Sequence, residues 1–256
     1  RGCPHILTQI KNLSSEYEKY NLSFSKPNQK NIDKQIQEYK VSDKIVVQSK
    51  MVKLSFIENG IDEEKIKIVP ISTNKKFKYK YKENNKEKKI FGFCGGAIIR
   101  KGLIYVIKAW IRNKEEKNKE LWLRTDLNSI KSVPFLFNLI NKRKDIKVLT
   151  YLKDMNYFFS SIDALIHPAA EEGFGMTVIE AVKSGVPVIT SKNVGVLDII
   201  NPDHVIVVSE NLIDNIYELI NEDKEYFEKI SKKIKNSINT DDYYKEDLNL
   251  SEIYSI

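Results

Sequence analysis

Two glutamates and a glycine-rich turn stand out within the segment 164–191. Glu172 opens the turn, which runs to Gly175, and Glu180 follows inside a short helical pattern whose other residues are mostly apolar. Glycines let a backbone approach a ligand closely, and the start of a helix offers unpaired N–H groups to an anion. A carboxylate in an apolar helix needs a partner or a ligand, because burying an unpaired charge is costly. The pattern therefore predicts a ligand that has hydroxyl groups in two places and an anionic group between them.

A second glycine-rich turn, from Gly95 to Gly102, carries Arg100 and Lys101 immediately before a predicted helix. Its spacing matches neither the Walker loop nor the G-x-G-x-x-G pattern. Cations at a helix start interact unfavourably with the helix dipole unless an anion is bound there. Two cations and backbone N–H groups at such a turn can hold a diphosphate, so we expect an anionic ligand at this turn as well.

The elements around these turns form an alternating pattern. Apolar runs at 164–167 and 186–190 flank the helical pattern, which ends at Gly185 and cannot continue through Pro187. Two apolar runs around one helix indicate a parallel βαβ unit that is buried on both faces, and hence an α/β fold. Further strands are expected at 90–94, 120–124, 146–150 and 204–208, and helices at 103–110, 133–142, 154–160, 194–200, 212–221 and 226–238.

The first 74 residues contain a second, shorter alternation. Helices are expected at 6–20, 31–40 and 50–59, the last followed by Gly60, and strands at 43–49 and 65–70. The stretch 75–88 is polar and rich in lysine, which fits a linker.

Composition limits the class of protein. Of 256 residues, 41% are hydrophobic and 30% charged, as in ordinary globular domains, and no apolar run approaches the ~20 residues that a membrane span needs. Cys3 and Cys94 lack the spacing of a metal or redox site, so we expect reduced thiols in a cytoplasmic protein. There is also no D-x-D pattern, so neither a metal nor another cofactor is expected.

The formal charge of +7 raises the question of an acidic partner. We find no nucleic-acid-binding module, so no nucleic acid is expected. The run 75–82 interleaves lysines with aromatic residues, and the alternative to a merely solvated run is peripheral contact with an anionic membrane, at its inner face.

The pattern E-G-F-G-x-x-x-x-E-A, followed by x-x-x-G-x-P-V-I, resembles the signature of the retaining GT-B glycosyltransferases called group 1, or family 4. Glu172 and Glu180 supply its E-x7-E pair, and the segment 185–188 matches its end. The resemblance implies an enzyme that moves a sugar from a nucleotide-sugar donor to a glycan or lipid-linked acceptor, with retention at the anomeric carbon. Cell-surface polysaccharide or glycolipid synthesis is the expected setting.

The resemblance also implies a division of the chain. Residues 1–74 would be the C-terminal part of an acceptor-binding Rossmann-like domain, and 75–88 the linker. Residues 89–256 would be the donor-binding domain, with a doubly wound parallel sheet and a crossing helix at 241–256. Because the sequence begins with arginine and lacks an early Rossmann half, we expect an incomplete chain that alone binds its donor weakly and turns over little.

The family's roles carry over to matching positions. Glu180 would hold the ribose hydroxyls, and Glu172 would contact the donor sugar. Lys101 and Arg100 would stabilise the leaving diphosphate. His5 would face the cleft, although a structural role is the alternative. The other donor-binding candidates lie in the two glycine turns and at the following helix start: Gly95, Gly96, Gly173, Phe174, Gly175, Met176 and Thr177.

Some positions depart from the family pattern. Gly96 stands where many relatives have an arginine. Thr125-Asp126 and Tyr151-Leu152 stand where a glycine commonly follows each strand, so base recognition does not carry over. The open alternatives are another GT-B enzyme, such as a sugar-nucleotide epimerase or a phosphorylase-like transferase, and a non-enzymatic binding module.

Overall fold

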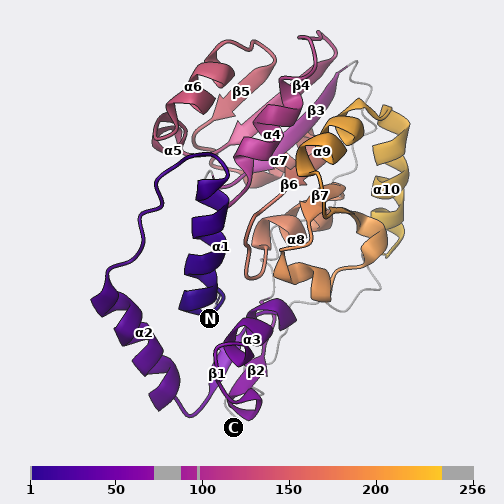
Figure 1. Cartoon of the computed structure of the whole chain (residues 1–256). Coiled ribbons are helices and arrows are strands. Elements are labelled where there is room, and N and C mark those ends of the chain that lie inside the picture. The colour runs from indigo at the N-terminus through magenta and orange to yellow at the C-terminus, as the bar shows by residue number, and fades with distance from the viewer. Residues whose placement is uncertain (1, 72–87, 97–98, 238–256) are drawn as a thin grey trace.

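Residues 2–71, 88–96 and 99–237 are described by the computed structural model (Figure 1). Three features expected from the sequence lie outside these residues: most of the linker, the basic run at 75–82 and the crossing helix at 241–256.

A six-stranded, entirely parallel sheet dominates the molecule. Its order is β5-β4-β3-β6-β7-β8, so the chain adds strands in one direction from β3 and in the other from β6. The α/β prediction and the doubly wound topology are both confirmed. The strands are β3 (Lys89–Cys94), β4 (Lys119–Arg124), β5 (Ile146–Leu149), β6 (Ala164–His167), β7 (Val188–Ser191) and β8 (Val205–Val208).

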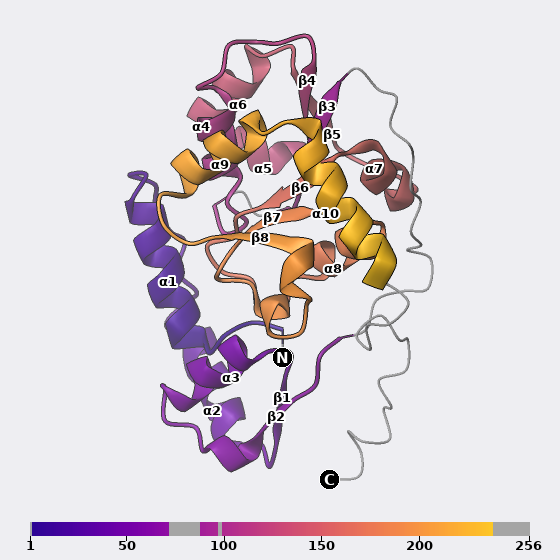
Figure 2. The same ribbon diagram turned by 90° about the vertical axis from the view of Figure 1, so that its right-hand side faces the viewer.

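Helices cover both faces of this sheet, as Figures 1 and 2 show. This explains why its strands are apolar on both sides: every residue of β6 and β7 is buried. Two hydrophobic clusters, one on each face, contain the helices' apolar residues. The helices are α4 (Leu103–Trp110), α5 (Leu127–Lys131), α6 (Pro134–Asn141), α7 (Met155–Ser161), α8 (Met176–Lys183), α9 (Leu212–Asn221) and α10 (Lys224–Ser237).

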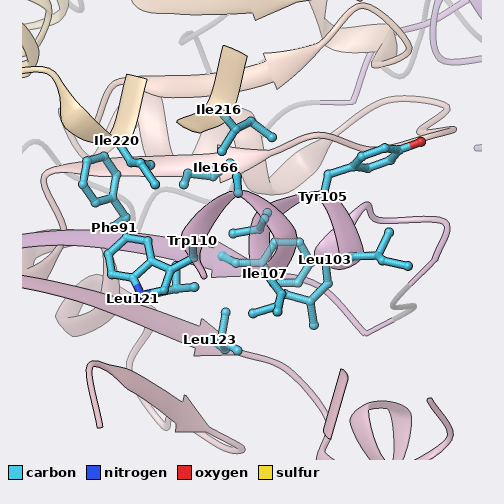
Figure 3. Close-up of a cluster of buried hydrophobic side chains, with 14 of the residues drawn as sticks. Phe91, Leu103, Tyr105, Ile107, Trp110, Leu121, Leu123, Ile166, Ile216 and Ile220 are labelled. Atoms are coloured by element: carbon cyan, nitrogen blue, oxygen red, sulfur yellow. The ribbon is translucent and has the colours of Figure 1, made fainter. Parts of the chain in front are cut away.

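Helix α4 shows how the sequence pattern becomes packing. Leu103, Ile107 and Trp110 lie four or three residues apart and are all buried, as the helical spacing predicted. In Figure 3 these side chains lie between the strands and α9, close to labelled residues such as Leu121 and Ile216. This packing fixes the glycine turn that precedes α4 against the carboxyl end of β3.

The N-terminal residues form a smaller unit with its own core. Strands β1 (Ile45–Val47) and β2 (Ile66–Ile68) pair in parallel, and helices α1 (Ile6–Glu18), α2 (Gln29–Val41) and α3 (Lys50–Ile57) pack around them. All five elements were predicted. In Figures 1 and 2, α1 extends from this unit along the larger one.

Two local expectations were wrong, and one helix was missed. The helix expected at 194–200 is a short 3₁₀ turn, η2 (Gly195–Asp198), because the N–H groups of Gly195 and Val196 donate to the carbonyls of Glu172 and Phe174 at 2.9 and 2.6 Å. His204 ends another 3₁₀ turn, η3 (Pro202–His204), and does not open the strand. Helix α5 was not predicted, although Asp126 caps it by accepting from the N–H of Ser129 at 2.9 Å.

Candidate functional site

The candidate site lies at the carboxyl ends of β3 and β6, where the strand order changes direction. In an open α/β sheet a ligand binds in the crevice at this position, because the two crossover connections leave the sheet on opposite faces. Cys94 ends β3 and His167 ends β6, and each is followed by one of the two glycine turns.

The turn after β6 is held by the neighbouring loop. The N–H of Glu172 donates to the carbonyl of Asn193 at 2.9 Å, and Glu172 forms an isolated parallel bridge with Val194. Gly175 caps α8 with a φ of 105°, and an added Cβ would lie 2.6 Å from Val194 Cγ1. Only glycine fits this position without strain. The helix start and the Glu172 carboxylate are therefore fixed relative to each other.

The turn after β3 is joined to the turn after β6. Gly102 has a φ of 77° at the start of α4, and an added Cβ would lie 1.9 Å from the carbonyl oxygen of Pro168. The N–H of Ala170 donates to the carbonyl of Arg100 at 2.9 Å. The ammonium of Lys101 forms an ion pair with the Glu172 carboxylate. The structure thus brings together an anion and a cation that stand far apart in the sequence.

The electrostatics of this centre follow from its burial. Burial, followed by the positive charge of Arg100, lowers the pKa of Lys101 to about 8. Burial also lowers the pKa of His167 to about 3, so its ring is neutral at neutral pH. Its Nε2 lies 3.8 Å from Glu172 Oε2, and neither ring nitrogen has a hydrogen-bond partner in the described part of the chain. The site therefore offers one largely buried cation, one carboxylate and a neutral imidazole.

Glu180 lies on α8, partly exposed, on the same side of the sheet as the thiol of Cys94. Burial raises the pKa of Cys94 to about 11, and the charges of Arg124, Glu180 and Lys101 also act on it. These three charged groups therefore all act electrostatically at the carboxyl end of β3.

The remaining donor-binding candidates occupy different surroundings. Phe174 is buried in the core under α8, so its side chain supports the turn and does not face a ligand. Met176 and Thr177 form the first turn of α8, where backbone N–H groups have no partner within the helix. Gly95 lies beside the side chain of Lys101, and Gly96 is exposed.

The structure places His5 in the core of the smaller unit. Its side chain is buried, and its ring contacts the rings of Tyr39 and Phe56 at centroid distances of 4.8 and 5.3 Å. Its Nδ1 accepts from the N–H of Leu7 at 3.3 Å and so caps α1, while its own N–H donates to Ser55 Oγ at 2.9 Å. This geometry gives His5 the structural role that was the alternative.

Sequence reasoning missed Glu171, the immediate neighbour of Glu172. It is only 2% exposed, and its Oε1 accepts from Gln9 Nε2 at 2.9 Å, which links the turn to α1. Burial raises the pKa of Glu171, although the hydrogen bond from Gln9 acts to lower it. The signal in the sequence was the doubled glutamate, since adjacent residues in extended backbone point to opposite sides. Glu171 lines a cavity of about 750 Å³ between α1, α3 and the turn after β6.

The smaller unit holds the turn after β6 directly. Ser49 Oγ caps α3 by accepting from the N–H of Val52 at 3.2 Å, and it donates to the carbonyl of Gly173 at 2.7 Å. The N–H of Lys50 donates to Asp198 Oδ2 at 2.5 Å. Asp198 is therefore used in a contact with α3.

Comparison with known proteins matches this region to one family. The sequence model of "Glycosyl transferases group 1" matches residues 74–237. The chain is 32% identical to the O-antigen biosynthesis glycosyltransferase WclY of Escherichia coli over 163 residues, which are 58% of this chain and 43% of WclY. It is 25% identical to the capsular polysaccharide biosynthesis glycosyltransferase CapM of Staphylococcus aureus, over 72% of this chain and 49% of CapM. The matched segment thus spans less than half of each relative.

Solved structures show the same fold. Anabaena HepE in complex with UDP-glucose has a TM-score of 0.74 at 16% identity, covering 91% of this chain and 68% of HepE. WaaG, a glycosyltransferase involved in lipopolysaccharide biosynthesis, has a TM-score of 0.70 at 16% identity, covering 90% of this chain and 69% of WaaG. These likenesses establish the GT-B architecture for the chain. Together with the family match over most of its length, they show that the chain belongs to the group 1 glycosyl transferases.

Proposed function

We propose that this chain binds a nucleotide sugar and takes part in transferring its sugar, with retention, to a glycan or lipid-linked acceptor. The observation that carries this proposal is the Lys101–Glu172 pair, held at the switch point of the sheet beside the start of α8. The relatives named for O-antigen and capsular polysaccharide synthesis support cell-surface glycan synthesis as the setting. The HepE complex with UDP-glucose supports a nucleotide-sugar donor.

The proposed roles follow from charge and position. A departing nucleoside diphosphate takes the electrons of the sugar–oxygen bond, so charge develops on its phosphate oxygens. The ammonium of Lys101, the guanidinium of Arg100 and the N–H groups at Met176 and Thr177 would stabilise that charge, and fixed donors of this kind are often the largest catalytic term. Because these cations can stabilise the negative charge of the diphosphate as a divalent metal ion would, we propose transfer without a metal.

The two carboxylates would hold the uncharged parts of the donor. In the free protein the Glu172 carboxylate forms an ion pair with the ammonium of Lys101, so each of these largely buried charges has a neighbour of opposite sign. When a diphosphate binds Lys101, we expect the Glu172 carboxylate to turn to a hydroxyl of the donor sugar. Glu180, further along α8, would accept from the ribose hydroxyls.

The arrangement of the chain into two units supports separate parts for donor binding and acceptor binding. We propose that residues 89–256 bind the donor and that 1–74 belong to an acceptor-binding domain. Among the described residues, none of the helices is long and apolar enough to cross a bilayer. Contact with an anionic membrane through the run 75–82 remains part of the proposal.

The test is a thermal-shift titration with UDP, GDP, ADP and their sugars on the 256-residue chain. We expect one base to stabilise the wild type, and Glu180→Ala to weaken its binding about 10- to 100-fold, because hydrogen bonds to a charged group are lost. Glu218→Ala, an exposed glutamate on α9, is the matched control and should bind as the wild type does. No stabilisation by any of these nucleotides would contradict the proposal.

A further inference from the structure

The carboxyl end of β4 carries a partly buried cation, Arg124. Arg124 is the last residue of β4, and its backbone carbonyl accepts from the N–H of Gly95 at 3.1 Å. Its side-chain Nε is buried and has no hydrogen-bond partner in the described part of the chain. By contrast, Arg112 and Arg143 are paired with Asp214 and Asp145 at 2.5 Å. A buried donor without a partner needs an explanation, and an absent ligand is one.

The strand geometry directs this side chain toward the candidate site. Side chains alternate along a strand, so Arg124 shares its face of the sheet with Trp122, which packs in the cluster under α8. Cys94 is the direct neighbour of Arg124 across the β3–β4 pair and packs against the same cluster. Arg124 therefore lies on the side of the sheet that carries Glu180.

The strand register places Arg124 beside Cys94, at the end of β3 that leads into the turn carrying Lys101. Arg124, Glu180 and Lys101 all influence the Cys94 thiol electrostatically. Glu180 is the proposed ribose contact, and Lys101 is the proposed diphosphate contact. Beyond the end of β3 the space beside Gly96 is open, since an added Cβ there would meet nothing within 4 Å. A ligand that spans Glu180 and Lys101 can therefore pass within reach of Arg124.

The chemistry of the guanidinium indicates which part of the ligand Arg124 contacts. Its planar fork of N–H donors matches the oxygens of a phosphate, and bidentate pairs of this kind are among the strongest hydrogen bonds in proteins. In a sugar nucleotide the phosphate between the ribose and the outer phosphate is the α-phosphate. We propose that Arg124 binds the α-phosphate of the donor nucleotide; this inference rests on the function proposed above.

The test separates phosphate from nucleoside by comparing three ligands: uridine, UMP and UDP, or the corresponding series of whichever base binds the wild type. Calorimetric titration of Arg124→Gln should show about 10- to 100-fold weaker binding of the mono- and diphosphate, because a charge-assisted pair is lost. Binding of the nucleoside should change less than about 2-fold. Arg124→Lys should recover part of the loss, because it keeps the charge without the fork.

Controls distinguish a ligand contact from a structural role. Arg112→Gln removes an exposed, ion-paired arginine on the same domain and should leave all three affinities unchanged. Without ligand, Arg124→Gln should unfold at the wild-type temperature, because its Nε has no partner to lose.

Equal weakening of nucleoside and monophosphate would overturn the α-phosphate assignment, and so would unchanged binding of all three ligands. A lower unfolding temperature without ligand would also contradict it. If the wild type binds none of the three ligands for any base, the proposed function fails instead, so the two failures are distinguishable.

Discussion

Buried polar groups at the two ends of the strands in the six-stranded sheet differ in whether they have hydrogen-bond partners. At the amino ends of the strands, Glu120 accepts from Lys88 and Trp122 and pairs with Lys147 at 2.7 Å. Asp145 likewise accepts from Arg143 and from Trp110 Nε1 at 3.0 Å. At this edge, buried carboxylates have several partners each.

The carboxyl edge carries the unsatisfied groups. All buried side-chain nitrogen and oxygen atoms without a hydrogen bond in the described residues lie at strand ends there, or in the loops and helix starts that follow. They belong to Arg124, Thr125, Asn156, His167, Glu171 and Glu172, the last of which contacts Lys101. Native proteins leave few such groups, and those they leave call for an explanation. This contrast is the one we expect if the amino edge of the sheet serves stability and the carboxyl edge binds the proposed ligand.

The largest expected effect is on the carboxyl edge. Lys101→Met should slow release of the nucleoside diphosphate from its sugar about 100- to 1,000-fold, because one fixed charge at the leaving group is removed. The measurement is the initial rate of diphosphate release from the sugar nucleotide. Lys144→Met, an exposed lysine at the amino edge, is the control and should keep the wild-type rate. Equal rates for Lys101→Met and the wild type would remove Lys101 from the site.

A substitution at the amino edge should lower stability and leave nucleotide affinity unchanged. Burial alone would raise the pKa of Glu120, but hydrogen bonds from Lys147, Lys88 and Trp122 outweigh it and lower that pKa to about 2. Glu120→Ala should therefore lower the free energy of unfolding by about 2 kcal/mol, and the unfolding temperature by roughly 4–8 °C, without changing nucleotide affinity.

The same carboxylate predicts a pH dependence of stability. Because folding lowers the pKa of Glu120, its contribution is complete above the ordinary glutamate pKa and is lost as the pH falls from about 4.5 toward 2. Urea unfolding of the wild type and Glu120→Ala should converge across this range. Glu116→Ala, which removes a more exposed pair with Lys119, should cost less than about 1 kcal/mol. If Glu120→Ala lowered the free energy of unfolding by no more than Glu116→Ala does, the proposed stabilising role of the amino edge would be contradicted.

A fourth prediction concerns the pH dependence of diphosphate binding. Since the pKa of Lys101 is lowered to about 8, affinity should fall as the pH rises through this value and the ammonium loses its proton. Arg100→Gln should move the fall to higher pH, because Arg100 is one of the groups that lower this pKa. His167, with its pKa near 3, should contribute no step between pH 5 and 9. Calorimetric titrations at several pH values would show a flat profile if Lys101 were not involved.

The smallest expected effect lies between the two units. Ser49→Ala removes the cap of α3 and the hydrogen bond to the carbonyl of Gly173, and should cost about 1 kcal/mol of stability. Nucleotide affinity should change by less than about 3-fold, because Glu172 and Gly175 keep their own contacts. A large loss of affinity measured by titration would show that the smaller unit shapes the donor site.

Sequence patterns predicted most of the fold because the signals were local. The spacing of Leu103, Ile107 and Trp110 and the apolar runs of β6 and β7 each follow from burial on one or two faces. Patterns failed where distant backbone intervened, as at η2, whose N–H groups donate to the turn after β6.

The candidate site was only partly predictable for the same reason. Glu172 and Lys101 were identified separately, but their direct pairing depends on the order of β3 and β6 in the sheet. His5 was expected at the cleft, and its packing against Tyr39 and Phe56 could not be read from neighbouring residues. Arg124 was passed over because a charged residue ending a strand is ordinary until its missing partner is seen.

Hydrogen–deuterium exchange with and without a saturating nucleotide sugar tests the central claim most directly, because it reads both edges of the sheet at once. The account predicts slower exchange at 95–102 and 170–180, the two turns and the start of α8, and unchanged exchange at 115–120 and 143–147. Protection confined to the amino edge, or spread equally over both edges, would contradict it.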